Sequence, residues 1–386
     1  MYLPFSVLLL WWCGKPSSAF HVGVLPHTPW LARTTSSTVG AGDQNYRTQS
    51  SSPSWMLSST SAASDTVIPD TSDRSLSPYS FAGLVEQRLL EKFDRDDIER
   101  VLESWRLADM DYEHREVIRE NCSQQAHSYV RGLHAQPFWN VDDHEWCQKL
   151  ESKYKEIYKE FSQQVLTPTQ RKNNNNNNNN KDDLVWSGAL TEEATSYGVG
   201  WKTLVLMNRG MWDAEHVRRF PVTAKAVRDA GVPVTEVFFA SMEADSTIQP
   251  HSDFTNFVLT SHLAVEIPYS GTNQCRLTVG DETRQWQNGN VMLFDTSILH
   301  DAVNESDQRR YILMMRVWHP DLTSTEREGL QFIYDCLEFP DLVHDDPAQR
   351  QKAEEQVQAM RTFPKFVARG FGAAGGKKKK PKKKKR

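Results

Sequence analysis

The sequence predicts a mainly β fold, a sandwich or jelly roll with α-helices around it. The second half of the chain contains short runs of β-branched and aromatic residues, separated by turn residues at 269–272 and 288–290. Several short strands at such spacing are typical of these folds. The segments on either side instead repeat apolar residues with the period of helices. The predicted strands are VTEVFFASM, NFVLTSHLAVEIP, CRLTVG, NVMLFD and YILMMRVW.

Length and cysteine content set further bounds. With 386 residues, 38% of them hydrophobic, the chain is long enough to bury a substantial core, in one large domain or two small ones. Its five cysteines are scattered without a C-x-x-C pair. They therefore indicate neither a disulfide framework nor a cysteine-based zinc site.

Residues 1–80 predict a targeting segment followed by a disordered region rich in Ser and Thr. The chain begins MYLPFSVLLLWWCG, an apolar run too short to span a bilayer, and an acid-poor Ser/Thr stretch follows. This order resembles the two-part plastid presequences of algae whose plastids lie inside the secretory system. We expect delivery to a plastid through the secretory pathway, with the ER or secretory lumen and a merely disordered N-terminus as alternatives.

The opposite end is a polybasic tail, KKKKPKKKKR, at 377–386. It carries nine positive charges, so the formal net charge of -5 leaves -14 for the rest of the chain. Such a run can bind anionic partners such as nucleic acid, import factors or anionic lipid, or can remain a solvated tail. It also resembles a nuclear import signal, which makes the nucleus a third possible location. Nothing else in the chain predicts specific reading of nucleic acid.

Helices are expected on both sides of the strands. No Gly or Pro occurs from Leu84 to Arg131, and apolar residues recur at helical spacing, so 81–131 predicts a helical region. A further helix follows in which Trp146, Leu150, Tyr154 and Tyr158 lie on one face and form core. The homopolymer at 173–180 predicts an inserted surface loop. Residues 331–376 predict a helical extension at the C-terminal side.

The chain has four His-x-[Asp/Glu] pairs, beginning at His114, His251, His319 and His344. With 12 histidines, one or two such pairs are expected by chance, so the motif alone does not select a site.

Context favours the pair His251 and Asp253. The two residues adjoin a predicted strand, where side chains two apart share a face. His300 follows another strand 47 residues later and could reach the same face. Two imidazoles and one carboxylate on one side of a metal leave three positions open, as in non-haem Fe(II) oxygenases. We predict His251, Asp253 and His300 as the metal ligands and the catalytic centre.

Arg310 begins the last predicted strand, RYILMMRVW. A guanidinium grips a carboxylate through two parallel hydrogen bonds, and a 2-oxo acid that chelates iron would present its distal carboxylate to such a group. Arg309 is an alternative, although neighbours on a strand face opposite ways. His262 is a second donor candidate, or else a hydrogen-bonded core histidine.

These segments resemble one family. QPHSDFTNFVLTSHLAVEIP and CRLTVGDETRQWQNGNVMLFDTSILHDAVNESDQRRYILMMRVWHPDLT closely resemble the aspartyl/asparaginyl β-hydroxylases, Fe(II)/2-oxoglutarate-dependent dioxygenases. The resemblance reaches back weakly to GLHAQPFW, so we place a catalytic domain at 132–330. It implies a double-stranded β-helix, also called a cupin-like jelly roll. It further implies that His251 and His300 ligate Fe(II), and that Arg310 and His262 hold the co-substrate 2-oxoglutarate while O2 is consumed.

The resemblance also frames the substrate. Animal members of the family have glycine where this chain has Asp253, and a substrate-gripping arginine where it has Thr260. Hydroxylation of a peptidyl side chain, at the β-carbon of Asp or Asn, is the leading prediction. Hydroxylation of a lipid acyl chain or a small molecule is the alternative, because bacterial relatives with His-x-Asp include hydroxylases of lipid acyl chains. A jelly-roll binding protein without turnover is a third reading.

Overall fold

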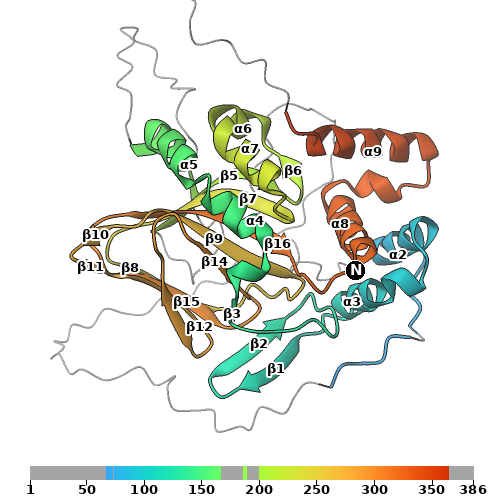
Figure 1. Ribbon diagram of the computed structural model, residues 1–386. Coiled ribbons are helices and arrows are strands. Elements are labelled where there is room, and N and C mark those ends of the chain that lie inside the picture. The colour runs from blue at the N-terminus through green and yellow to red at the C-terminus, as the bar shows by residue number, and fades with distance from the viewer. Residues whose placement is uncertain (1–66, 73, 167–185, 189–199, 365–386) are drawn as a thin grey trace, which may run out of the picture.

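The computed structural model describes residues 67–72, 74–166, 186–188 and 200–364 (Figure 1). The predicted targeting segment, the homopolymeric loop at 173–180 and the polybasic tail lie outside these ranges.

Two antiparallel sheets, one smaller and one larger, form the centre of the molecule. The smaller sheet has the order β13-β12-β15-β8, and the larger has the order β3-β14-β9-β16-β7-β5-β4, with β6 beside β5. The smaller sheet comprises β8 (Ser246–His251), β12 (Cys275–Val279), β13 (Glu282–Gln285) and β15 (His300–Asn304). The larger comprises β3 (Phe138–Trp139), β4 (Ser187–Gly188), β5 (Trp201–Asn208), β6 (Met211–Trp212), β7 (Val234–Met242), β9 (Val258–Glu266), β14 (Val291–Phe294) and β16 (Arg310–Trp318).

The chain passes back and forth between these sheets. β7, β9, β14 and β16 enter the larger sheet, whereas β8, β12, β13 and β15 enter the smaller one. A small ribbon of β10 (Tyr269–Ser270) and β11 (Thr272–Asn273) joins β9 to β12. This winding is the double-stranded β-helix, or jelly roll, and it confirms the predicted fold class.

Successive side chains of β16 point alternately into two hydrophobic cores, one between the sheets and one under the helices. Ile312 and Met314 pack between the sheets with residues of the smaller sheet such as Leu277. Leu313 and Met315 face the other way and pack under helices. Because the pairing of β16 with β7 is regular from residue 310 to 316, Arg310 and Arg316 share the inner face with Ile312 and Met314.

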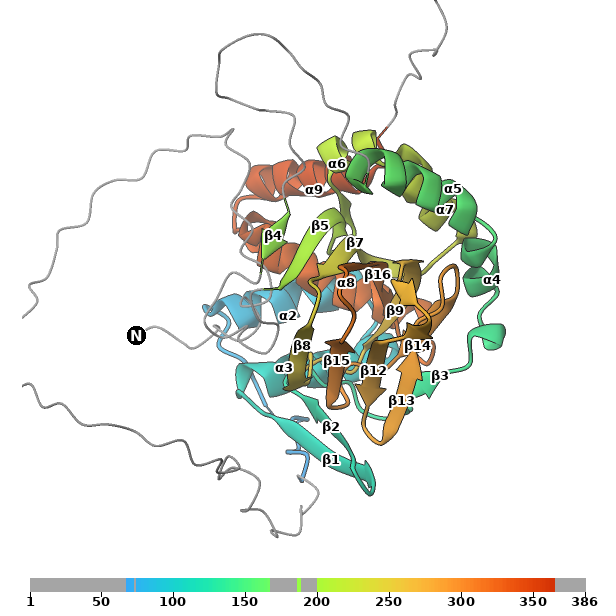
Figure 2. The ribbon, with the colours of Figure 1, turned by 90° about the vertical axis from the view of Figure 1, so that its left-hand side faces the viewer.

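Helices cover the outer face of the larger sheet (Figure 2). They are α4 (Glu145–Glu151), α5 (Tyr154–Phe161), α6 (Ala214–Arg219) and α7 (Pro221–Ala230). The predicted aromatic stripe lies here, with Trp146 and Leu150 buried, but it is divided between α4 and α5. Shorter helical turns occur at Asp96–Ile98, Val141–Asp143, Ser162–Leu166 and Pro340–Val343.

A second helical cluster packs at one end of the sheets. It comprises α2 (Phe81–Lys92), α3 (Glu99–Asp109), α8 (Ser324–Glu338) and α9 (Pro347–Arg361). Thr323 and Glu326 form a capping box at the start of α8. Glu326 also pairs with Arg100 of α3 at 2.6 Å, which ties the two helices together.

The prediction of helix throughout 81–131 is wrong beyond α3. Residues 114–126 form a hairpin of β1 (His114–Arg119) and β2 (Cys122–Ala126). Asn121 turns the chain with a φ of 59°, a conformation that asparagine tolerates better than most residues. The absence of Gly and Pro permits a helix but does not require one. Every second residue of β2 is buried, which is the period of a strand.

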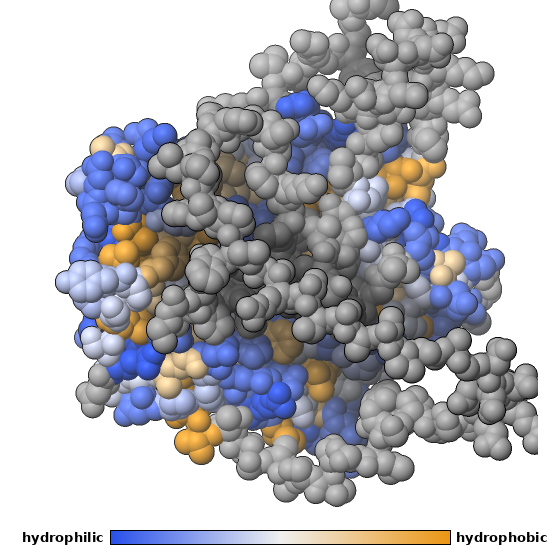
Figure 3. All heavy atoms as spheres, turned by 180° about the vertical axis from the view of Figure 1, so that it is seen from behind, coloured by the Kyte–Doolittle hydropathy of each residue, from blue (hydrophilic) through white to orange (hydrophobic). Residues whose placement is uncertain are grey.

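One face of the described surface is largely polar. Seen from behind, hydrophilic residues predominate and hydrophobic ones form small separate areas (Figure 3). Among the described residues, no helix combines the length and the apolar character needed to cross a bilayer.

Candidate functional site

Two histidines lie side by side on neighbouring strands of the smaller sheet. β8 ends at His251, β15 begins at His300, and the two residues are direct partners in the antiparallel pairing. Their ring centroids are 4.3 Å apart. The strand pairing therefore brings together two imidazoles that are 49 positions apart in the chain.

A backbone carbonyl determines the orientation of each imidazole. His251 Nδ1 lies 2.8 Å from the carbonyl oxygen of Gln249, and His300 Nδ1 lies 2.9 Å from that of Ile298. A carbonyl can only accept, so each Nδ1 carries a hydrogen, and in the neutral form of such a ring Nε2 keeps its lone pair. Burial lowers the pKa of His300 to about 4, which keeps this ring neutral at physiological pH. Both rings are thus prepared as metal ligands.

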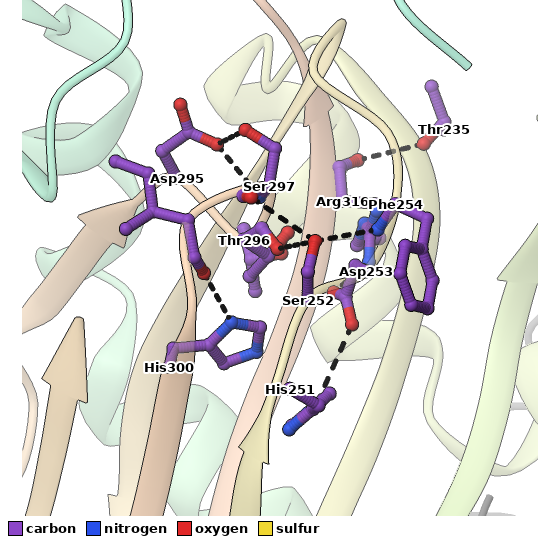
Figure 4. A network of polar contacts seen from close by, with 12 residues as sticks. Thr235, His251, Ser252, Asp253, Phe254, Asp295, Thr296, Ser297, His300 and Arg316 are labelled. Carbon is purple, nitrogen blue, oxygen red and sulfur yellow. Dashed lines mark hydrogen bonds and ion pairs between the residues drawn. The ribbon is translucent and has the colours of Figure 1, made fainter. Parts of the chain in front are cut away.

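Asp253 completes the cluster from a loop. The strand ends at His251, so strand alternation does not place Asp253, contrary to the prediction from spacing. Its backbone N–H donates to the carbonyl oxygen of Thr296 at 2.8 Å. Its Oδ1 lies 3.7 Å from His251 Nε2, and one ligand atom each from His251, Asp253 and His300 lies within 4.8 Å of the others (Figure 4). Among the described residues this is the one group with metal-site geometry.

Arg316 of β16 binds the other oxygen of this carboxylate. Its Nη1 donates to Asp253 Oδ2, and both side chains are almost fully buried. Burial raises the pKa of Asp253, but the charge of Arg316, together with smaller effects of neighbouring groups, outweighs burial and lowers it overall. Asp253 is therefore an ionised ligand with one oxygen held by the protein.

The segment that begins with β2 supports the loop of Asp253. Ser252 Oγ donates to the carbonyl oxygen of Gln125 at 2.7 Å and accepts from the backbone N–H of Phe254 at 3.0 Å. The N–H groups of His127 and Ser128 both donate to the carbonyl oxygen of Phe254, at 2.9 and 3.0 Å. Phe254 has a φ of 56°, a strained conformation for a bulky residue, which these bonds hold in place.

The same segment supports the loop that leads to His300. The N–H of Gln125 donates to the carbonyl oxygen of Ser297 at 2.8 Å, and the N–H of Leu299 donates to that of Ser123 at 3.2 Å. Residues 123–128 therefore connect the two loops that carry the candidate ligands.

A second group of polar side chains lies on the inner face of the larger sheet. Arg310 is 1% exposed, and its guanidinium stacks 4.3 Å from the ring of Trp286. The indole Nε1–H of Trp286 donates to His262 Nδ1 at 3.2 Å, which leaves the hydrogen of His262 on Nε2. Burial and the nearby Arg310 hold the pKa of His262 well below its usual range, so this ring is a neutral donor.

Three donor atoms of this second group have no partner. Arg310 Nε, Arg310 Nη1 and His262 Nε2 are buried and make no hydrogen bond. Burying such groups unpaired is costly, so their grouping fits an anionic ligand, and a carboxylate suits the fork of a guanidinium. Burial also lowers the pKa of Arg310 to about 10, which still leaves it charged at neutral pH.

Phe294 links the two groups. Its ring centroid lies 6.2 Å from that of His300 and 4.8 Å from that of His262. One aromatic ring therefore lies close to both the metal cluster and His262 of the second group.

The other candidate residues lie elsewhere. His114 is on β1, not in a helix, and stacks 3.7 Å from Tyr129. His319 Nε2 lies 2.9 Å from the carbonyl oxygen of His134, and His344 Nδ1 accepts from the N–H of Asp346 at 2.9 Å. These histidines have structural partners and join no metal-binding group among the described residues.

Arg309 is also set apart from the site. It points away from Arg310 and pairs with Glu243, with Nε 3.0 Å from a carboxylate oxygen. Strand alternation between these two neighbours therefore separates a surface ion pair from a buried unpaired guanidinium.

Sequence reasoning missed Arg316 and Trp286. A signal for Arg316 was available, because it lies six residues after Arg310 on the same strand and so on the same face. Trp286 stands in the ETRQW segment, but its contacts with both His262 and Arg310 depend on how β13 leads into β14.

The pH dependence of stability offers a test of the loop before His300. Asp295 Oδ1 accepts from the backbone N–H of Ser297 at 2.9 Å, but its Oδ2 is buried without a partner. Burial raises the pKa of Asp295 to about 7. The folded state then holds this proton more firmly than the unfolded state does. The resulting stability is complete below the ordinary carboxyl pKa of 3.8 and is lost as pH rises to about 7.

We expect Asp295→Asn to remove this loss, because the amide cannot ionise. The free energy of unfolding of the variant, minus that of the wild type, should increase by about 1.4 kcal/mol per pH unit between about pH 4 and pH 7. Urea unfolding of metal-free protein at several pH values measures it. Asp307→Asn, at an exposed position, is the control and should show no such slope. A pH-independent difference for Asp295→Asn would contradict the assignment.

Known proteins are similar to the part of the chain that carries the site. Residues 151–320 match the family model described as Aspartyl/Asparaginyl beta-hydroxylase. A human protein named aspartate beta-hydroxylase domain-containing protein 2 is 30% identical over 142 residues, which are 35% of this chain and 37% of that protein. The human aspartyl/asparaginyl beta-hydroxylase is 28% identical over 137 residues, which are 34% of this chain and 18% of that protein. The aligned part is thus well under half the length of these relatives.

Among solved structures, a 2OG-Fe(II) oxygenase family oxidoreductase from Burkholderia pseudomallei is similar with a TM-score of 0.23 and 12% identity, covering 30% of this chain and 65% of that one. So low a score adds nothing to the strand order described above. The matched range 151–320 includes every predicted site residue, from His251 to Arg310. Residues 151–320 therefore belong to the aspartyl/asparaginyl beta-hydroxylase family, as their motifs predict.

Proposed function

We propose that this protein is an Fe(II)- and 2-oxoglutarate-dependent dioxygenase that hydroxylates a C–H bond of its substrate. The observation that carries the proposal is the pairing of two sites in one inter-sheet space. One is the His–Asp–His cluster, and the other is the set of unpartnered donors on Arg310 and His262. The first suits a metal, and the second suits the far carboxylate of a ligand bound to that metal.

In this proposal His251, Asp253 and His300 hold Fe(II) through three ligand atoms. Arg310 takes the distal carboxylate of 2-oxoglutarate in its guanidinium fork, with His262 as an added donor. Bound iron would supply the oxidising chemistry, in which O2 and 2-oxoglutarate are consumed and a hydroxyl group is added to the substrate.

The protein's own groups prepare the site for these ligands. The neutral His300 offers its lone pair without first losing a proton, and Asp253 is already ionised. Trp286 orients both Arg310 and His262. Because these groups are fixed and buried before any ligand binds, little reorganisation is needed on binding.

The substrate we propose is a peptidyl side chain, hydroxylated at the β-carbon of Asp or Asn. Support comes from the names of the relatives, which are aspartate or aspartyl/asparaginyl beta-hydroxylases. Thr260 is the reason for the alternative substrate, an acyl chain or a small molecule. It is fully buried, and its hydroxyl lies 3.2 Å from that of Thr296, so this position offers no cation to a substrate carboxylate.

The enzyme proposal predicts that His300→Ala abolishes turnover. We expect wild-type protein with Fe(II) to form succinate from 2-oxoglutarate and a product 16 Da heavier than its substrate, because one oxygen atom is inserted. His300→Ala should lose both products, and bound iron after gel filtration should fall with them, since a ligand is missing. Mass spectrometry and iron analysis measure these quantities.

His344→Ala is the matched control, because His344 also begins a His-x-Asp pair but is exposed and is not part of the cluster. It should keep turnover and bound iron. Equal losses in both variants would mean that His300 is not a ligand. Absence of succinate from iron-loaded wild type over a broad panel of peptides and lipids would favour the binding-protein alternative.

A second prediction concerns the co-substrate. Arg310→Lys keeps a positive charge but removes the planar fork and its stacking on Trp286. We expect its affinity for 2-oxoglutarate to fall about tenfold or more, while metal affinity is unchanged. Calorimetric titration of the metal-loaded protein measures this. Arg309→Lys, in the surface ion pair with Glu243, should bind 2-oxoglutarate as the wild type does. Equal affinity in the two variants would argue against the assigned role of Arg310.

For location, we propose delivery to a plastid through the secretory pathway. The sequences concerned, at both ends of the chain, lie outside the described residues. A fluorescent protein inserted within 173–180 leaves both ends free. We expect a plastid signal that is lost on deletion of residues 2–34 and kept on deletion of 377–386. A nuclear signal that depends on 377–386 would instead support the nuclear alternative.

A further inference from the structure

The two oxygens of Asp253 have different surroundings. Oδ1 faces the histidines, 3.7 Å from His251 Nε2, whereas Oδ2 accepts a hydrogen bond from Arg316. The carboxylate side chain is 1% exposed and that of Arg316 is 8% exposed, so water does not compete effectively for this contact. The carboxylate is therefore divided between a side that faces the candidate metal position and a side that is bonded to the protein (Figure 4).

Arg316 comes from a rigid part of the fold. It lies in β16, at the centre of the larger sheet, paired with Thr260 of β9 on one side and Glu236 of β7 on the other. Its backbone carbonyl also accepts from Thr235 Oγ1 at 3.2 Å. The loop of Asp253 is held separately by its hydrogen bonds to residues 125–128 and Thr296. With both partners fixed, the Arg316 contact determines how the carboxylate is rotated.

A carboxylate can bind a metal through one oxygen or through both. If Asp253 uses one, then His251, His300 and Asp253 occupy three positions of an octahedral ion and leave three open. A co-substrate that chelates through two atoms and O2 together need three. A carboxylate that binds through both oxygens would leave only two.

We propose that Arg316 is a positioning residue that restricts Asp253 to one-oxygen coordination and so keeps the third position open. This inference rests on the proposed function. Arg316 also neutralises Asp253, so the buried protein groups of the cluster carry no net charge from this pair. The full charge of a divalent metal then remains to attract a dianionic co-substrate.

The test separates metal binding from co-substrate binding, without turnover. Co(II) replaces Fe(II), because its absorption spectrum reports the number of ligands, and calorimetry follows Co(II) and then 2-oxoglutarate. In Arg316→Met, Asp253 is released and the repelling cation is gone. We expect Co(II) affinity equal to or higher than that of wild type, and affinity for 2-oxoglutarate reduced about tenfold or more. The spectral change that 2-oxoglutarate causes should diminish accordingly.

Two further variants test whether the protein still folds and whether Arg316 acts through Asp253. Arg316→Lys keeps the charge and one donor, and it should recover most of the affinity for 2-oxoglutarate. In Asp253→Ala, the Arg316→Met change should have little further effect, because Arg316 acts through Asp253. The double variant removes both members of the buried pair, so no charge is left unpaired.

The outcomes are distinct. If Arg316→Met loses Co(II) affinity as strongly as Asp253→Ala, Arg316 merely holds the ligand in place and the inference is wrong. Unchanged 2-oxoglutarate binding in Arg316→Met, with Co(II) bound, also overturns it, while the proposed function stands. If the wild type binds neither Co(II) nor 2-oxoglutarate, both the proposed function and this inference fail.

Discussion

The pairing of β8 with β15 is the constraint on which the site depends. It sets His251 directly opposite His300. The backbone carbonyls of Gln249 and Ile298 hold the two Nδ1 atoms, so that both Nε2 atoms are left for the metal cluster. A shift of one residue in this pairing would move one imidazole to the opposite face of the sheet. The jelly roll can hold the site because β8 and β15 are hydrogen-bonded neighbours at one edge of the smaller sheet.

The segment before the matched family domain takes part in this arrangement. Residues 123–128 precede the matched range 151–320, yet their backbone groups bond to both loops that lead to the candidate ligands. The structural unit that supports the candidate site is therefore larger than the part shared with the relatives. The β1–β2 hairpin lies beside the smaller sheet in both views of the ribbon (Figures 1 and 2).

The two arginines on the inner face of β16 differ in whether the protein supplies a partner for their charge. Arg316 is paired within the protein, whereas Arg310 is buried with two nitrogen atoms unpartnered. A buried guanidinium without a carboxylate lowers stability, and the stacking on Trp286 offsets this only in part. Such a cost is reasonable at a position where a ligand supplies the missing carboxylate.

The sequence by itself indicated five strands of the two sheets, most of the helices and the residue types of the site, but not β8 and β15, which carry the two histidines. The predicted strand runs and the spacing of His251, Asp253, His300 and Arg310 are local patterns, and local patterns can be read without a fold. Only the tertiary structure decided the hairpin at 114–126, because its strands are selected by contacts with distant loops. It also decided the partnership of Asp253 with Arg316, 63 positions apart, since spatial proximity between distant segments follows from sheet order and cannot be read from local spacing.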